Sequence, residues 1–281
     1  MVSSDPRPLL LFLHIRKAGG TTLKDIIDRH YDPAAILRFE VSTMQLARDG
    51  FSQLSEPQKR GLEVIAGQMP FGLHRFLPRP STYITLMRDP IDRVVSYYHH
   101  VLRRSEHYAH DQVVSEKMSL HDFVCSGVSA DTDNGLVRTL CGIEDVLTTP
   151  EVGQCSREML ENAKKNIEQH FPVAGLLERF DETLILLRRT FGWKNLFYTR
   201  KNVNPNRAGK QTVDVKVRAE IEKRNALDME LYGFTRKRFD SMLSRQGPGF
   251  ERELSSFRRL NALYRIKILR STVRRVRAFL R

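Results

Sequence analysis

The sequence predicts an α/β fold in which helices flank a central, mostly parallel sheet, with a basic helix added at the C-terminus. Short apolar or β-branched runs alternate with longer segments of helical periodicity, which is the pattern of βαβ units. The first run, Leu9–Leu13, ends abruptly in a cation, two glycines and two threonines before a helical pattern begins. A chain of 281 residues, 41% of them hydrophobic and 28% charged, is large enough to form one sizeable α/β domain.

Strands are expected where apolar, β-branched and aromatic residues cluster between turn-forming residues. The predicted strands are Leu9–Ile15, Val64–Gly67, Thr82–Met87, Pro172–Leu177 and Asn195–Thr199. The glycines, prolines and aromatic residues of Gln68–Pro80 predict a loop.

Helices are expected from the spacing of apolar residues and from start signals such as Asp89-Pro90, because proline suits the first helical turn. The predicted helices are Thr22–Tyr31, Ser42–Asp49, Pro90 to about Arg104, Ser119–Cys125, Asn134–Cys141, Glu158–His170, Asp181–Phe191, Val215–Leu231 and Thr235–Ser244. Gly247-Pro248-Gly249 then separates a body of residues 1–246 from a basic amphipathic helix at residues 250–281.

The formal net charge of +13 suits a polyanionic cofactor, an acidic substrate, a nucleic acid or an anionic membrane face. Residues 250–281 hold ten Lys or Arg and two Glu, a net of +8, which leaves +5 for the remainder of the chain. The basic tail could cover an acceptor site, bind an anionic glycan or lie on a membrane as a peripheral contact. We favour the fourth alternative, in which its apolar residues pack on the body or on a second subunit as a homodimer.

Three cysteines, Cys125, Cys141 and Cys155, occur without C-x-x-C spacing, which argues against a disulfide framework and against a thiolate zinc site. Free thiols fit a reducing compartment. The Leu9–Leu13 run is too short for a membrane span or for the apolar core of a secretory signal. We therefore expect a cytoplasmic protein.

The loop after the first strand has the composition of an anion cradle. Glycines at 19 and 20 let the backbone approach an anion, and the N–H groups of a helix start favour negative charge. Lys17 adds a positive charge, and Thr21 and Thr22 add hydroxyl donors. Because Lys17 precedes the glycines, the order differs from the ordinary P-loop of ATPases and kinases. The alternative is a strand-to-helix turn that uses glycine for its geometry alone.

A second group of polar residues follows the strand Thr82–Met87. Arg88 leaves the strand end, and Ser96 lies about two turns into the next helix. A phosphate between them could accept a bidentate contact from Arg88 and a hydrogen bond from Ser96. Arg93 could pair with Asp89 or serve the ligand, and a capped helix with a surface arginine is the alternative. Since Lys17 and Arg88 both follow the carboxyl end of a strand, we expect them to share one crevice.

Together the two stretches resemble the sulfotransferases that use 3′-phosphoadenosine 5′-phosphosulfate (PAPS), specifically the branch of the heparan-sulfate 2-O-sulfotransferases and their bacterial relatives. That branch carries H-I-P-K-(T/A)-G-(G/S)-T, which is similar to residues 14–21 here, and R-(D/N)-P-x-x-R-x-x-S-x-Y, which residues 88–98 match at every fixed position. Further similarity lies in Asp133–Arg138, Gly175–Glu182 and Asn225–Asp228. The resemblance covers roughly residues 9–235 and implies a P-loop-like three-layer fold in a sulfotransferase domain at residues 1–246.

The resemblance implies roles for particular residues. It implies that the 5′-phosphosulfate is held by Arg16, Lys17, Ala18, Gly19, Gly20, Thr21 and Thr22, and that the 3′-phosphate is held by Arg88 and Ser96. A late basic loop would close over the donor with Arg200, Lys201, Asn202, Asn206 and Arg207, although the same residues also suit a solvated basic turn. The expected reaction moves a sulfuryl group to an acceptor hydroxyl, on a glycan or another alcohol, and leaves 3′-phosphoadenosine 5′-phosphate (PAP).

Lys17 is the predicted catalytic residue that supports the sulfuryl oxygens and the leaving phosphate. The general base cannot be assigned by a direct match. The family that the chain resembles places a histidine after a glycine where this chain has Gly67-Gln68, and glutamine cannot accept the proton. His74 is the predicted substitute. No metal is expected, since the family's chemistry needs none and the histidines at 99, 100, 107 and 110 match no known metal-site spacing.

Three other functions remain open at this stage. The charge suits a nucleic-acid-binding protein, although no helix-turn-helix, zinc-finger or RNP pattern occurs and no specific nucleic acid partner is expected. The first loop could belong to a variant nucleotide or sugar kinase. Gln68 would also suit a sulfotransferase-like binding module that has lost activity.

Overall fold

The computed structural model describes residues 8–39, 49–142, 151–199 and 213–279. Five strands form one sheet in the order β2-β3-β1-β4-β5, and every described pairing in it is parallel. The strands are β1 (Leu9–Leu13), β2 (Ile36–Phe39), β3 (Val64–Gly67), β4 (Ser81–Met87) and β5 (Val173–Leu176). All five residues of β1 are buried, as expected of a central parallel strand covered on both faces.

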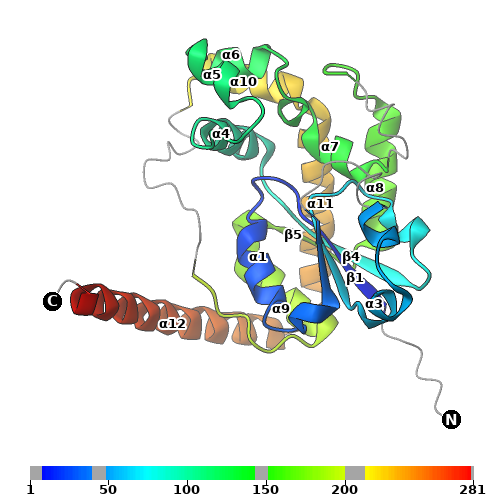
Figure 1. The fold of residues 1–281 in the computed structure, drawn as a ribbon, viewed down its shortest axis with the longest axis vertical. Coiled ribbons are helices and arrows are strands. Elements are labelled where there is room, and N and C mark those ends of the chain that lie inside the picture. The colour runs from blue at the N-terminus through cyan, green and yellow to red at the C-terminus, as the bar shows by residue number, and fades with distance from the viewer. Residues whose placement is uncertain (1–7, 40–48, 143–150, 200–212, 280–281) are drawn as a thin grey trace.

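Helices cover both faces of the sheet and produce three layers. In Figure 1, α1 (Gly20–Ile27) and α9 (Phe180–Phe191) lie in front of the strands, and α11 (Ala226–Ser244) lies behind them. Both α9 and α11 contact β5, and α8 (Arg157–His170) packs between α7 (Gly135–Leu140) and α11. The predicted α/β fold with a flanked parallel sheet is therefore confirmed.

Shorter elements connect the strands and the larger helices. The long helix α12 (Gly249–Phe279) packs against α9 and extends beyond the body (Figure 1). The remaining elements are η1 (Pro33–Ala35), α3 (Glu56–Gly61), η2 (Leu73–Phe76), α4 (Pro90–Val101), α5 (His110–Ser115), α6 (Leu120–Cys125), η3 (Ala130–Thr132), η5 (Leu177–Arg179) and α10 (Val215–Arg224).

Most predicted elements are confirmed to within a few residues, and the strand predicted at Asn195–Thr199 is wrong. Residues 194–199 pair with no strand in the described part of the chain. Instead, the backbone N–H of Tyr198 donates to the Asn261 side chain on α12, and the Phe197 ring stacks on Phe257. Contacts with a distant helix therefore hold an extended segment that sequence alone assigns to the sheet.

Two further differences have local causes. The strand β2 was not predicted, because it is a four-residue strand at the edge of the sheet and lies in a stretch of mixed, largely polar sequence. The helix predicted at Val215–Leu231 divides at Asn225, whose buried amide donates to the Thr132 and Ile221 carbonyls. The helix expected at Ser42–Asp49 lies outside the described residues except at Asp49.

Cys125, Cys141 and Cys155 are free thiols. Within the described ranges we find no helix that is both long and apolar enough to cross a membrane.

Candidate functional site

The turn from β1 into α1 has a backbone that few side chains tolerate. Lys17 and Gly19 both adopt left-handed conformations, with φ of 64° and 86°. Gly20 lies directly against the His14 ring, because a Cβ added at Gly20 would come within 2.0 Å of His14 Cδ2. In the described structure no side chain caps the start of α1, and no acidic residue lies in its first turn. The first N–H groups and the helix dipole therefore suit an anion.

The threonines and the alanine of this turn differ in what they offer a ligand. Thr21 is exposed and Thr22 half-buried, so their hydroxyls lie at the surface of the turn. Ala18 is fully buried and can contribute only its backbone.

Lys17 lies among other cations at the carboxyl edge of the sheet. Burial, with a further contribution from the charges of Arg103, Arg88 and Arg104, lowers its pKa to about 8. Placing like charges together in a partly buried site costs free energy unless a ligand compensates them. This cluster therefore has the character of a polyanion site.

Arg88, which follows β4, contacts the loop after β1, so the two sequence motifs meet at this residue. Its side chain is only 5% exposed, and its Nη1 donates a hydrogen bond of 3.1 Å to the carbonyl oxygen of Lys17. The structure thus brings Lys17 and Arg88 into direct contact, and the predicted crevice between them stays a prediction. The contact also fixes the guanidinium at the carboxyl end of β4, beside the start of α1.

The helix α4 brings further groups to the same edge. Ser96, His100 and Arg103 are spaced i, i+4 and i+7, which places them along one side of the helix and its continuation. Burial and, next, the charge of Lys17 lower the pKa of His100 to about 4, so this side of α4 is near Lys17. Ser96 is half-buried on it. His100, Arg103 and Arg104 were not predicted as site residues, although their spacing from Ser96 was a usable signal.

Arg16 connects the first loop to Gln68 and Asp131. Its Nε donates to Gln68 Oε1 at 2.5 Å, and its Nη1 pairs with Asp131 Oδ2 at 2.9 Å. Burial opposes its charge, but Asp131 and nearby phenols raise its pKa overall. Position 68, where the resemblance implied a histidine, therefore lies beside the loop, but its glutamine is engaged in holding Arg16.

His74, the predicted base, lies elsewhere. Its Nδ1 is 3.1 Å from the Tyr83 hydroxyl, and its ring centroid is 4.6 Å from that of His170. Tyr83 pairs with Leu11 in the middle of β1, and His170 ends α8 just before β5 begins. His74 therefore packs between the sheet and the end of α8, behind the strand ends that carry Lys17. The structure does not bring the two predicted catalytic residues together.

Burial also affects the chemistry of His74. It lowers the pKa of the imidazole to about 4, with smaller contributions from His170 and Arg75 in the same direction. The ring packs against Phe71 and Tyr83 as part of an aromatic cluster. These contacts are those of a packed histidine.

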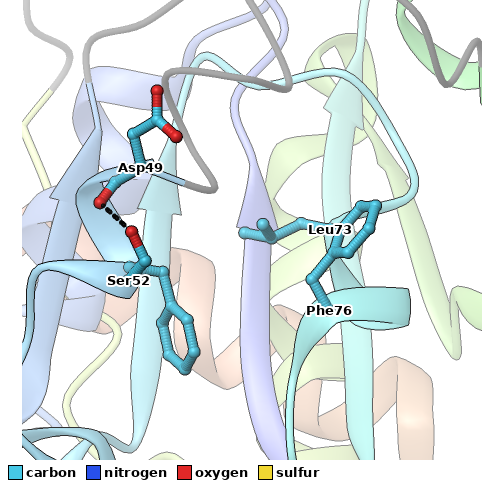
Figure 2. A pocket seen from close by; sticks show the side chains of 5 residues that line it. Asp49, Ser52, Leu73 and Phe76 are labelled. Carbon is cyan, nitrogen blue, oxygen red and sulfur yellow. Dashed lines mark hydrogen bonds between the residues drawn. The ribbon is translucent and has the colours of Figure 1, made fainter.

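A hollow of about 340 Å³ lies near His74 but away from the cation cluster. Figure 2 shows Leu73 and Phe76 of η2 on one side of it and Asp49 and Ser52 on the other. None of the predicted site residues lines it.

Arg93, the arginine inside the second motif, is a structural residue. It is completely buried and contacts Asp131 and Asp228, with Nη2 donating to the Asp131 carbonyl at 2.7 Å. Gly135 leaves room for its guanidinium, because a Cβ there would meet Nη2 at 2.6 Å. The described side-chain partners of Arg93 are therefore Asp131 and Asp228 rather than Asp89.

The same network explains two of the segments that carry the resemblance. Asp228 accepts the N–H groups of Leu136 and Val137 at 2.9 Å each, and so caps the start of α7. Asn134, at φ 50°, accepts from the Asp228 backbone and donates its own N–H to Asn225. Asp133–Arg138 and Asn225–Asp228 therefore clamp α4, α7 and α11 together rather than contact a ligand.

The late basic loop predicted at Arg200, Lys201, Asn202, Asn206 and Arg207 lies outside the described residues. We find no group of three or more metal-binding side chains in the described ranges.

With this geometry in place, we compared the chain with known proteins. A sequence model of the family described as galactose-3-O-sulfotransferase matches residues 1–274. Heparan-sulfate 6-O-sulfotransferase 2 of Homo sapiens is 28% identical over 276 residues, covering 82% of this chain and 44% of the human protein. Heparan-sulfate 6-O-sulfotransferase 1 of Homo sapiens is 29% identical over 292 residues, covering 82% and 65%.

These matches correct one prediction from the sequence. The sulfotransferase resemblance is supported, but the 2-O branch is not, because the matching heparan-sulfate enzymes are 6-O-sulfotransferases. The chain spans less than half the length of the first of these relatives.

Proposed function

We propose that this chain, which belongs to the galactose-3-O-sulfotransferase family, moves a sulfuryl group from PAPS to a glycan hydroxyl. The observation that carries the proposal is the cation cluster of Lys17, Arg88, Arg103 and Arg104 beside the start of α1. A site of this kind fits a donor with several negative charges better than it fits a neutral ligand.

The residues present fit the two ends of such a donor. No side chain caps the start of α1 in the described structure, so its backbone N–H groups, with Lys17 and the threonines, suit the phosphosulfate end. Arg88 and Ser96 suit the 3′-phosphate, because a guanidinium and a hydroxyl together supply directed donors. PAPS would supply the activated sulfuryl group. The five residues predicted in the late basic loop remain part of this proposal.

Lys17 would stabilise the negative charge that develops on the leaving phosphate. The positive charge is already held at the strand end by the folded backbone, so little reorganisation is required during the reaction. A Lys17→Ala enzyme should lose orders of magnitude in kcat, with a smaller effect on the KM for the acceptor.

We assign the proton transfer from the acceptor hydroxyl to His100 rather than to His74. His100 lies on the side of α4 that is near Lys17, and its lowered pKa keeps the imidazole neutral and able to accept a proton at pH 7. A bound polyanion would offset the neighbouring cations and raise that pKa toward the usual value for histidine, which strengthens the base when the site is filled.

The acceptor class rests on the relatives, whose names identify them as heparan-sulfate 6-O-sulfotransferases. A glycan hydroxyl is therefore the proposed acceptor for this chain.

Calorimetric titration of the purified chain with PAP and with ATP tests the proposal. We expect PAP to bind more tightly than ATP, and Arg88→Ala to weaken PAP binding by at least tenfold. Arg60→Ala, at an exposed position on α3, is the matched control and should bind normally. Tighter binding of ATP would favour a variant kinase, and salt-sensitive DNA binding without PAP affinity would favour a nucleic-acid-binding protein.

Turnover with labelled PAPS and a panel of glycan acceptors tests the choice of base. His100→Ala should lower kcat by about 10²- to 10⁴-fold while PAP still binds. His74→Ala should retain kcat in the fraction of enzyme that folds, as judged by PAP binding stoichiometry. The reverse pattern would restore His74 as the base, and no turnover in the unmodified chain with intact PAP binding would indicate a binding module.

A further inference from the structure

The helix α12 consists of an anchored part and an exposed part. Phe250, Leu254 and Phe257 are buried against the body, and Arg258 pairs with Asp181 and Glu182 of α9. The Tyr264 ring still stacks on Phe197, so the packing continues for about four turns. The helix is therefore held firmly on α9 up to this point.

Beyond Tyr264, every side chain from Arg265 to Arg270 is exposed. Figure 1 shows this part of α12, in red, extending past the α/β body. Apolar side chains are prominent in it, with Ile266 46%, Ile268 37% and Leu269 65% exposed, and Leu263, just before Tyr264, is 59% exposed. One exposed leucine is unremarkable in a folded protein, but a row of exposed leucine and isoleucine side chains on one helix requires an explanation.

The row lies on the side of α12 that faces away from the body. Phe257 and Asn261 mark the inward side, since both are buried. At 100° per residue, Leu263, Ile266 and Leu269 fall within an arc of about 120° centred on the outward side. We call these three residues the outward stripe.

Cations surround the outward stripe. Arg265 and Lys267 project on its two sides, and Arg259 and Arg270 lie at its ends, all of them exposed. The sequence from residue 254 to 281 contains nine Lys or Arg and no Asp or Glu. The long stems of these side chains can lie along an apolar surface while their charges remain in a polar layer.

We propose that the outward stripe and its flanking cations form a docking surface for an anionic lipid bilayer, on which α12 lies parallel to the membrane plane. Leucine and isoleucine side chains would enter the boundary between headgroups and acyl chains, and the arginines and the lysine would contact the negatively charged headgroups.

The charge of α12 favours a lipid bilayer over a second copy of the chain or a nucleic acid. A second copy of α12 would bring another segment of nine cations and no anions against the first, and like charges repel. A nucleic acid would use the cations but leave the stripe in water. An anionic lipid surface satisfies both features at once.

Sedimentation of the full chain with lipid vesicles tests this surface. Vesicles of phosphatidylcholine and phosphatidylserine at 3:1 should bind the chain at 0.1 M salt, and pure phosphatidylcholine vesicles should bind it at least tenfold more weakly. Salt at 0.5 M should reduce the binding, because it screens the headgroup charges. Equal binding to both vesicle types, or binding to neither, would overturn the proposal.

Variants locate the binding on α12. Each cation near an anionic surface raises affinity about fivefold, so removal of three should lower it about 100-fold. The test variant is Arg265→Gln with Lys267→Gln and Arg270→Gln. Its matched control removes three exposed cations on other helices and should retain most of the binding: Arg60→Gln, Lys165→Gln and Lys237→Gln.

The outward stripe has its own pair of variants. Leu263→Ser with Leu269→Ser should weaken vesicle binding by at least tenfold without loss of the folded state, because both side chains are already exposed. Val114→Ser with Val215→Ser changes two exposed apolar residues elsewhere and should have no effect. Unchanged vesicle binding in the stripe variant would refute its role. A dimer in ultracentrifugation that this variant abolishes, without vesicle binding, would show a second copy as the occupant instead.

Discussion

Polyanion binding should change the protonation of Lys17. In the free protein burial and three arginines hold its pKa near 8, so the amine is about half protonated at pH 8. A bound PAP would place several negative charges against the same cations and return the pKa toward its usual value of 10.5. Binding at pH 8 should therefore take up about half a proton per site.

Calorimetry measures this uptake directly, because the observed heat varies with the ionisation enthalpy of the buffer. Titrations with PAP in two buffers of different ionisation enthalpy should give about half a proton at pH 8, where the phosphates of PAP are already ionised. The uptake at pH 8 should vanish in Lys17→Met. An uptake that is absent at pH 8, or that persists in Lys17→Met, would refute the reasoning.

The same pKa has a consequence for stability. Because the folded-state pKa is lower than the unfolded one, the fold carries an unfavourable charge at every pH below about 8. The difference between 10.5 and about 8 corresponds to about 3 kcal/mol, so Lys17→Met should unfold less readily by up to that amount at pH 7. This gain in the free energy of unfolding should shrink as pH rises from 8 to 10.5, because Lys17 loses its proton in the folded state before it does so in the unfolded state. Denaturant titrations at pH 7 and pH 10 measure it, and a destabilised variant at pH 7 would contradict the argument.

Three further predictions concern the supporting structure. Asp228→Ala should lower the free energy of unfolding by about 3–5 kcal/mol in a denaturant titration, because it removes one of the two carboxylates that pair with the buried Arg93 and also removes the cap of α7. Glu230→Ala, which removes only exposed ion pairs on the same helix, should cost no more than about 1 kcal/mol. Gly20→Ala should weaken PAP binding at least tenfold by displacing the His14 ring, whereas Gly61→Ala, with open space around it, should leave binding unchanged.

The parts of the fold that the sequence predicted well share one physical property. Val64–Gly67 and the strand ending at Met87 are buried on both faces, so their apolar runs are continuous and end at clear turn residues. The helix after Asp89-Pro90 was predicted from its cap, and the Asp89 side chain does accept the Asp92 N–H. Local chemistry sufficed in these places because no distant contact opposes it.

The errors occur where a distant residue decides the local conformation. The segment at Asn195–Thr199 has strand-like composition, but Asn261, more than sixty residues away, receives a backbone donor that a sheet would otherwise use. His74 was predicted as the base because it lies in the loop after Gln68; Tyr83 and His170 set its position in the fold, and its role stays a prediction for the His74→Ala turnover experiment. Neither contact leaves a trace in the neighbouring sequence.

The second motif shows how one stretch of sequence can serve two purposes. Arg88 and Ser96 lie toward the cation cluster, whereas Arg93, between them, points into the interior and meets Asp228. A phosphate site needs its donors fixed to within a fraction of an ångström, and the buried Arg93 network fixes the helix that carries them. Substitutions at Arg88 and at Arg93 should therefore differ in kind: the first should lower PAP affinity with the unfolding midpoint unchanged, and the second should lower that midpoint before any effect on the site can be measured.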